Sequence, residues 1–227
     1  MPLRAIVFDF DGVIANSEPL HFRAFRDVLK EAGIELRERD YYRRYLGYDD
    51  SGAFRAIGAD HGRTWSHDEI ATLTSRKASR MELLERDGSV LFPGAAAAVR
   101  RAADAVPLAI ASGALLAEIR RVLDAADLTH AFAAIVSAEL TRASKPAPDP
   151  YQRAVALLAD AMKDPALRPS DCVAVEDSRW GLESARAAGL RTVAITSSYD
   201  AAELALADLV IASVADLQVA DLRRLLF

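Results

Sequence analysis

Five or six short apolar runs recur along the chain, each followed by a longer segment of different pattern. They cover residues 5–10 (AIVFDF), 107–112 (PLAIAS), 134–137 (AIVS), 172–176 (CVAVE), 192–196 (TVAIT) and 209–212 (LVIA). The runs are rich in β-branched residues and nearly continuous, which is typical of strands buried on both faces of a parallel sheet. The hydrophobic pattern therefore predicts a parallel sheet built from these runs.

The segments between the runs have a helical pattern. Residues 115–126 and 150–162 are rich in Ala and Leu, with apolar positions at helical spacing. Strands that alternate with helices are typical of a doubly wound α/β domain. The predicted fold class is therefore α/β with a parallel sheet covered by helices.

One long segment, residues 17–86, contains no comparable strand run. It is rich in Arg, Glu, Ala and Leu, and Phe22, Phe25 and Leu29 lie at helical spacing. Gly88 and the turn-forming residues 92–94 (FPG) indicate the return to the α/β core. The sequence therefore predicts a core of residues 1–16 and 87–227, with a helical cap of residues 17–86 inserted after the first strand.

Composition and charge narrow the class of partner. Of the 227 residues, 52% are hydrophobic and 27% are charged, which is typical of a globular protein with a substantial core. The formal net charge of -5 argues against a nucleic-acid partner, because such binders carry a basic face. The sequence shows no apolar run of membrane-spanning length and no signal peptide, which predicts a cytoplasmic protein without a membrane partner. Its single cysteine, Cys172, excludes a disulfide within the chain. The expected oligomeric state is a monomer or a homodimer.

Polar residues follow the predicted strands, at the edge where open parallel sheets bind their ligands. They are Asp9, Asp11 and Gly12 after the first strand, Ser112 and Gly113 after the second, Lys145 after the third, and Glu176, Asp177 and Ser178 after the fourth. The carboxyl ends of parallel strands meet at one edge, so we expect these residues to converge on one crevice.

Four carboxylates in one crevice repel each other unless a cation neutralises them. Mg²⁺ prefers oxygen ligands and takes only a few of them from protein. We expect the carboxylates of Asp9 and Asp177 and the carbonyl of Asp11 to be direct ligands. Glu176 completes this predicted Mg²⁺ site, either directly or through water.

The remaining polar residues suit phosphate chemistry. Lys145 can keep the Asp9 carboxylate ionised and offset charge on a transferring phosphoryl group. Ser112 and the backbone N–H groups near Gly113 can donate hydrogen bonds to phosphate oxygens. Of the first pair of aspartates, one can form an aspartyl-phosphate while the other transfers protons.

The ordered set of these motifs resembles the haloacid dehalogenase superfamily, in the branch of phosphoglycolate phosphatases and β-phosphoglucomutases. The matching segments are residues 9–13 (DFDGV), Ser112, Lys145 and Glu176-Asp177. The resemblance implies Asp9 as nucleophile, Asp11 as general acid/base and Mg²⁺ as cofactor. The implied activity is Mg²⁺-dependent hydrolysis of a small phosphomonoester, such as a sugar phosphate or phosphoglycolate.

Local matches extend this resemblance into the cap. Residues 16–21 (NSEPLH) are similar to the hinge and first cap helix of sugar-phosphate phosphatases and β-phosphoglucomutase. This similarity implies that His21 lies near the general acid/base and binds substrate. Lys77 resembles a cap lysine that reaches the active site. Residues 46–50 (LGYDD) lack the Gly-x-Ser-Arg element with which β-phosphoglucomutases hold a distal phosphate. This departure favours hydrolysis over isomerisation.

Other interpretations remain open from the residues alone. His21 also fits a packed position beside Phe22 and Phe25, and Lys77 fits a solvated helix surface. A β-phosphoglucomutase-like enzyme would return the phosphoryl group to another hydroxyl of its substrate. A non-catalytic Mg²⁺- or phosphate-binding module of the receiver type would use the same aspartates without turnover, but would not need the long helical insert.

Overall fold

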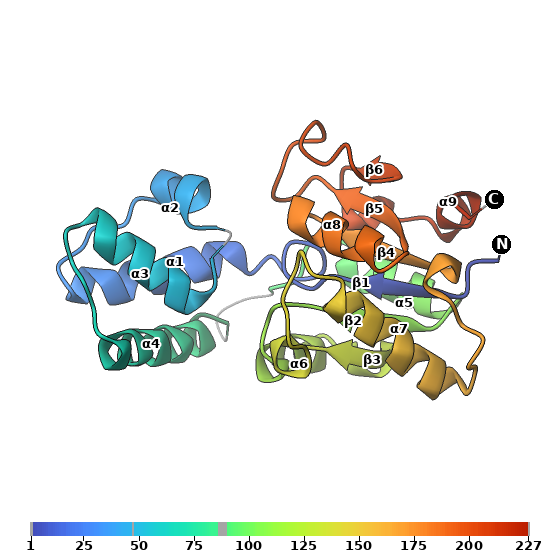
Figure 1. Ribbon diagram of the computed structural model, residues 1–227, viewed down its shortest axis with the longest axis horizontal. Coiled ribbons are helices and arrows are strands. Elements are labelled where there is room, and N and C mark those ends of the chain that lie inside the picture. The colour runs from blue at the N-terminus through green and yellow to red at the C-terminus, as the bar shows by residue number, and fades with distance from the viewer. Residues whose placement is uncertain (1, 47, 86–89, 227) are drawn as a thin grey trace. The chain divides into compact units, whose positions relative to one another are not determined.

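The computed structural model describes residues 2–46, 48–85 and 90–226. The chain divides into two compact units, one formed by Met1–Asn16 with Leu91–Phe227 and the other by Ser17–Val90 (Figure 1). The predicted return to the core at residue 87, with Gly88, lies outside the described residues.

The larger unit is built on a parallel sheet. Its strands in the described part of the chain are β1 (Ala5–Phe8), β2 (Leu108–Ala111), β3 (Phe132–Val136), β4 (Cys172–Glu176), β5 (Arg191–Ile195) and β6 (Leu209–Ile211). Their order is β3-β2-β1-β4-β5-β6, and all neighbouring pairs are parallel. The predicted α/β class is confirmed. The order changes direction between β1 and β4, so the ligand crevice of such a sheet is expected at their carboxyl ends.

Burial along the strands follows their place in the sheet. Every residue of β1, β2 and β4 is buried, whereas the edge strand β6 is only half-buried. The first apolar run, residues 5–10, is longer than the strand it forms, since β1 covers Ala5–Phe8. Beyond it, the carbonyl of Phe10 accepts hydrogen bonds from three amides in a tight turn, those of Val13, Ile14 and Ala15.

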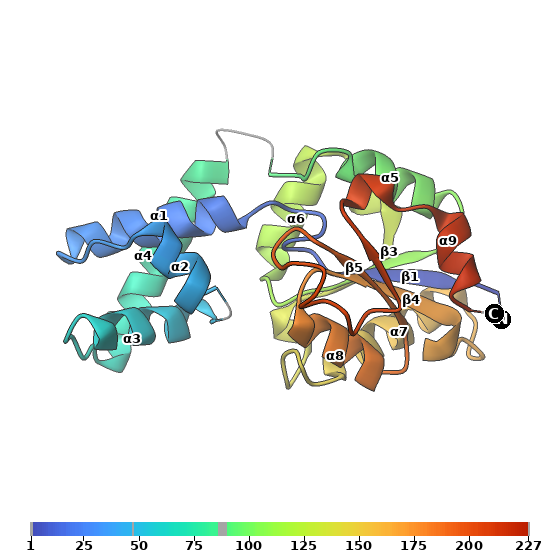
Figure 2. The same cartoon turned by 90° about the horizontal axis from the view of Figure 1, so that it is seen from above.

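Helices cover both faces of this sheet. They are α5 (Ala95–Ala103), α6 (Leu116–Ala125), α7 (Asp149–Met162), α8 (Arg179–Ala187) and α9 (Val219–Arg224). Short 3-10 turns lie at Thr129–Ala131, Ala138–Leu140, Pro169–Asp171 and Val214–Asp216. Figure 2 shows α5, α6 and α9 on one face and α7 and α8 on the other, as a doubly wound fold requires.

The smaller unit is helical. It contains α1 (Glu18–Glu31), α2 (Glu38–Arg44), α3 (Asp50–Asp60) and α4 (His67–Glu85). Phe22, Phe25 and Leu29 of α1 are buried in its core, together with Tyr41 and Phe54, as their helical spacing predicts. None of the helices in the described ranges combines the length and apolarity needed to cross a bilayer.

Candidate active site

The segments that follow β1 and β4 approach each other closely at Gly12. The amide of Asp9 still donates to the carbonyl of Val175 at 2.8 Å, so Asp9 leaves β1 in register with β4. Gly12 follows with a φ of 80°, a left-handed conformation that favours glycine. A Cβ atom at Gly12 would lie 1.9 Å from Oδ2 of Asp177. The absence of a side chain at Gly12 therefore allows the acidic ends of the two strands to meet.

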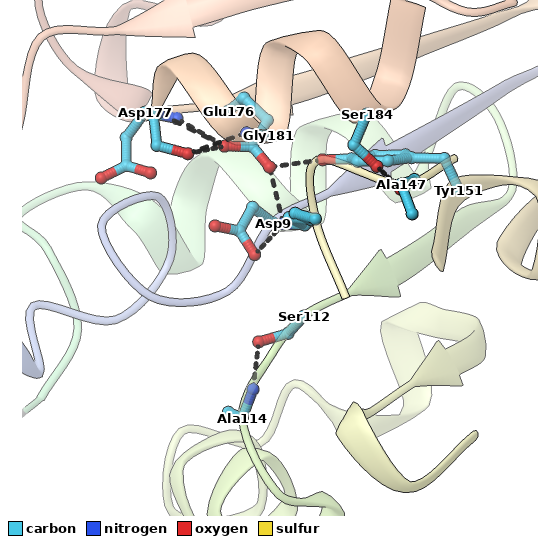
Figure 3. A network of polar contacts seen from close by, with 11 residues as sticks. Asp9, Ser112, Ala114, Ala147, Tyr151, Glu176, Asp177, Gly181 and Ser184 are labelled. Carbon is cyan, nitrogen blue, oxygen red and sulfur yellow. Dashed lines mark hydrogen bonds and ion pairs between the residues drawn. The ribbon is translucent and has the colours of Figure 1, made fainter. Parts of the chain in front are cut away.

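Three carboxylates gather at this point. Asp9, Glu176 and Asp177 each offer an oxygen within 4.8 Å of the others. Their exposed fractions are 8%, 0% and 6%, so water screens them little. Figure 3 shows their side chains together at the carboxyl edge of the sheet.

Lys145 lies between two of these carboxylates. Its Nζ is 2.7 Å from Oδ1 of Asp9 and 2.6 Å from Oε1 of Glu176. The ring centroid of Tyr151, at the start of α7, lies 5.3 Å from the same Nζ, within range of a cation–π interaction. The structure therefore holds the ammonium group in contact with the predicted nucleophile.

The turn that carries Lys145 is tied to the helix after β4. The hydroxyl of Ser184 in α8 donates to the carbonyl of Ala147 at a distance of 2.5 Å (Figure 3). At the start of the same helix, a Cβ on Gly181 would lie 1.9 Å from the carboxyl group of Glu176. The first turn of α8 thus closes directly on that carboxylate.

Glu176 accepts hydrogen bonds at both of its oxygens. Oε1 accepts from Lys145 Nζ at 2.6 Å and from the Tyr151 hydroxyl at 2.7 Å. Oε2 accepts from the amides of Asp177 and Ser178 and from the Ser178 hydroxyl, at 3.1 to 3.3 Å. This full set of donors explains how a carboxylate can remain wholly buried.

The site carries more negative than positive charge. Burial raises the pKa of Asp9 to about 7, and the charge of Glu176 adds to this effect, although Lys145 opposes it. Burial, followed by the charges of Glu176 and Asp9, raises the pKa of Asp177 well above its usual range. Burial lowers the pKa of Lys145, but the two adjacent carboxylates outweigh it and raise that pKa. Three carboxylates facing one ammonium fit an additional cation with oxygen ligands, such as Mg²⁺.

The other predicted residues lie around Asp9. Ser112 follows β2 and is 3% exposed, and its Oγ accepts from the amide of Ala114 at 3.0 Å. Because β2 and β4 flank β1, Ser112 lies on the other side of Asp9 from Glu176 and Asp177 at the end of β4 (Figure 3). Asp11 lies in the turn after β1, and Gly113 is exposed beside Ser112.

Two residues of this region are not among those predicted from the sequence. Tyr151 contacts both Lys145 and Glu176, and Ser198 donates its hydroxyl to Oδ2 of Asp177 at 2.5 Å. Ser198 follows a predicted strand and so lies at the same sheet edge as the motif residues. This position in the sequence could have indicated that it belongs to the site. Tyr151 lies within a predicted helix, where an aromatic residue indicates only packing.

A second polar cluster lies inside the smaller unit. The Nζ of Lys77 in α4 is 2.6 Å from His21 Nδ1 in α1 and 2.8 Å from Asp50 Oδ1 in α3. Lys77 is 1% exposed, so it is not a solvated surface charge. Burial, followed by the charge of Lys77, lowers the pKa of His21 to about 3. A neutral His21 accepts a hydrogen bond from Lys77, whose charge is paired with Asp50.

This cluster predicts a pH dependence of stability. The pKa of His21 is about 3 in the folded protein and its ordinary value is 6.5, so between these pH values unfolding is accompanied by the uptake of a proton. Stability should therefore fall as the pH drops from 6.5 towards 3, by up to about 2 kcal/mol at pH 5. Urea unfolding at pH 7 and pH 5 measures this change. His21→Gln keeps an acceptor for Lys77 but does not titrate, so it should weaken the dependence; an unchanged pH profile would contradict the assignment.

Comparisons with known proteins agree with this architecture. The family model for haloacid dehalogenase-like hydrolases matches residues 3–189. Protein CbbY of Rhodobacter capsulatus is 35% identical over 206 residues, covering 88% of each chain. Hexitol phosphatase B of Escherichia coli K12 is 29% identical over 222 residues, covering 96% of each chain. The crystal structure of CbbY from Rhodobacter sphaeroides in complex with phosphate has a TM-score of 0.80 at 27% identity, covering 95% of this chain and 96% of that one.

Proposed function

Because the chain belongs to the haloacid dehalogenase-like hydrolase family and is a phosphoric monoester hydrolase, we propose that it hydrolyses a small phosphomonoester through an aspartyl-phosphate on Asp9. One observation carries this proposal. The Asp9 carboxylate lies 2.7 Å from the ammonium of Lys145 and within 4.8 Å of two further buried carboxylates. These distances support a mechanism in which Asp9 is the nucleophile, beside a fixed positive charge and a set of oxygen ligands.

The acidic residues would hold Mg²⁺ in this proposal. Asp9 and Asp177 would contribute carboxylate oxygens and Asp11 its carbonyl, with Glu176 acting directly or through water. The bound ion would offset the charges that raise the pKa values of Asp9 and Asp177, and would neutralise part of the phosphate charge.

The reaction would proceed in two steps. An oxygen of Asp9 attacks phosphorus, the bond from phosphorus to the alcohol oxygen breaks, and Asp11 protonates the departing alcohol. Asp11 then takes a proton from water as that water attacks the aspartyl-phosphate, which releases inorganic phosphate and regenerates Asp9. Throughout, Lys145 offsets charge on the phosphoryl oxygens, and Ser112 and the amide of Gly113 donate hydrogen bonds to them.

We further propose His21 and Lys77 as substrate-binding residues of the cap. Within the smaller unit the charge of Lys77 is already paired with Asp50, and His21 is neutral. This cluster therefore offers little net positive charge to a second anionic group. The pairing favours a substrate with an uncharged leaving group, a sugar or polyol phosphate, ahead of phosphoglycolate. The printed name of one relative, hexitol phosphatase, is consistent with this choice.

A phosphate-release screen tests the proposal. The panel contains sugar phosphates, hexitol phosphates and phosphoglycolate, each with Mg²⁺ and with a chelator. We expect phosphate release from at least one sugar or hexitol phosphate, with loss of activity in the chelator. Interconversion of a sugar phosphate without phosphate release would indicate a mutase instead. Inactivity on the whole panel would favour a non-catalytic module.

Three properties stay predictions from the sequence. They are the cytoplasmic location, the monomeric or homodimeric state, and the lack of nucleic-acid and membrane partners. Size-exclusion chromatography with light scattering would measure the oligomeric state directly.

A further inference from the structure

The loop after β5 contacts both acidic strand tips. The Ser197 hydroxyl donates to the carbonyl of Gly12 at 2.5 Å, and the Ser198 hydroxyl donates to Oδ2 of Asp177 at 2.5 Å. Neither serine belongs to the four motifs that define the site. The loop therefore brings two hydroxyl donors to the site from a fifth strand.

The hydrogen bond from Ser198 reaches one of the two oxygens of Asp177. Oδ2 accepts from Ser198 and packs so closely on Gly12 that a Cβ there would lie 1.9 Å away. This enclosure fixes the orientation of the carboxylate. With Oδ2 engaged, Oδ1 is the oxygen that Asp177 can offer to a cation.

The neighbouring carboxylate is arranged differently. Glu176 accepts hydrogen bonds at both oxygens, including one from Tyr151 and one from Lys145. Both oxygens of Glu176 therefore carry hydrogen bonds, one of them from Lys145, whereas the hydrogen bond from Ser198 reaches one oxygen of Asp177. Glu176, the last residue of β4, and Asp177, the residue after it, thus have different hydrogen-bond partners.

We propose that Ser198 is a positioning residue of the metal site, whose hydroxyl fixes Asp177 so that Oδ1 meets the ion. This inference rests on the proposed function in one respect, that the acidic cluster holds Mg²⁺. The inference goes beyond the proposed function because it assigns an effect on Mg²⁺ affinity to a residue outside the four motifs. Hydrogen bonds that orient a metal ligand commonly contribute about 10- to 100-fold in affinity.

Calorimetric titration of Mg²⁺ into the full-length, substrate-free protein tests this role. Ser198→Ala should weaken Mg²⁺ binding about 10-fold or more, while Ser198→Thr, which keeps the hydroxyl, should bind nearly as the unsubstituted protein does. Ser197→Ala is the matched control. Its hydroxyl donates to a backbone carbonyl in a turn that the Phe10 carbonyl also holds, so its Mg²⁺ affinity should change less than about twofold.

Turnover gives a second readout that a merely structural role would not produce. In Ser198→Ala the Mg²⁺ concentration for half-maximal activity should rise about 10-fold, while kcat at saturating Mg²⁺ stays within about threefold of the unsubstituted enzyme. Circular dichroism of each variant checks the fold. Should Ser198→Ala not fold, the pair Ser198→Thr and Ser198→Val has nearly equal shape and isolates the hydroxyl.

The outcomes separate this inference from the proposed function. Equal Mg²⁺ affinity in Ser198→Ala and the unsubstituted protein would overturn the positioning role and leave the proposed phosphatase intact. A comparable loss in Ser197→Ala would also overturn it, because the effect would then belong to the loop as a whole. Failure of the unsubstituted protein to bind Mg²⁺ would overturn the inference together with the proposed cofactor.

Discussion

Asp9→Asn is expected to lower kcat by about 10⁴-fold or more while the protein stays folded. A carboxamide cannot form the acyl-phosphate bond through which the proposed reaction passes. The substitution should be tolerated structurally because burial already raises the pKa of Asp9 to about 7, which shows that the folded protein disfavours a charge there. The melting temperature should therefore be unchanged or higher in the absence of Mg²⁺.

Phosphate release under single-turnover conditions, with thermal unfolding beside it, measures both effects. Asp104→Asn is the matched control, since Asp104 is exposed at the end of α5 and should tolerate the same change without effect. A rapid quench of the unsubstituted enzyme should also yield protein carrying one phosphoryl group on Asp9. Activity retained in Asp9→Asn would remove Asp9 from the role of nucleophile.

Lys145→Met is expected to reduce both activity and stability. The ammonium lies 2.7 Å from Asp9 and 2.6 Å from Glu176, and Glu176 is fully buried. Removal of Lys145 leaves the charge of the buried carboxylates uncompensated. Loss of one partner of a buried ion pair commonly lowers the free energy of unfolding by about 3–5 kcal/mol. Loss of a fixed positive charge at the transferring phosphoryl group should lower kcat by about 10²- to 10³-fold.

Urea unfolding and steady-state kinetics separate the two effects. Lys30→Met provides the control, because Lys30 is exposed near the end of α1 and should tolerate the substitution with little change. Excess Mg²⁺ should restore part of the stability lost in Lys145→Met, since a second cation can offset the same carboxylates. A variant as stable and active as the unsubstituted protein would show that the ion pairs contribute nothing.

Much of the fold follows from local sequence pattern. The runs that form β1, β2 and β4 are continuous and apolar because these strands are buried on both faces. Helical spacing in residues 17–86 likewise indicates a helical insert, and the described residues of the smaller unit form helices α1 to α4. β1 ends at Phe8, two residues before the end of the predicted run, because Phe10 is apolar and buried although its backbone already turns.

Within the site, the sequence by itself determined which chemical groups lie at the carboxyl edge of the sheet. Apolar strands leave polar residues only where they end, so Asp9, Lys145 and Asp177 could be identified without coordinates. Their motif order also indicated the family. These are properties of neighbouring residues along the chain, which a sequence displays directly.

Only the tertiary structure decided which of these groups meet. That Tyr151 and Lys145 engage Glu176, that Ser198 takes one oxygen of Asp177, and that Asp50 pairs with Lys77 depend on segments distant in sequence. A hydrogen bond requires its two atoms within about 3 Å and suitably aligned. The periodic pattern of apolar residues indicates on which face of a helix or strand a side chain lies. It does not specify which distant atom comes within hydrogen-bond distance of that side chain.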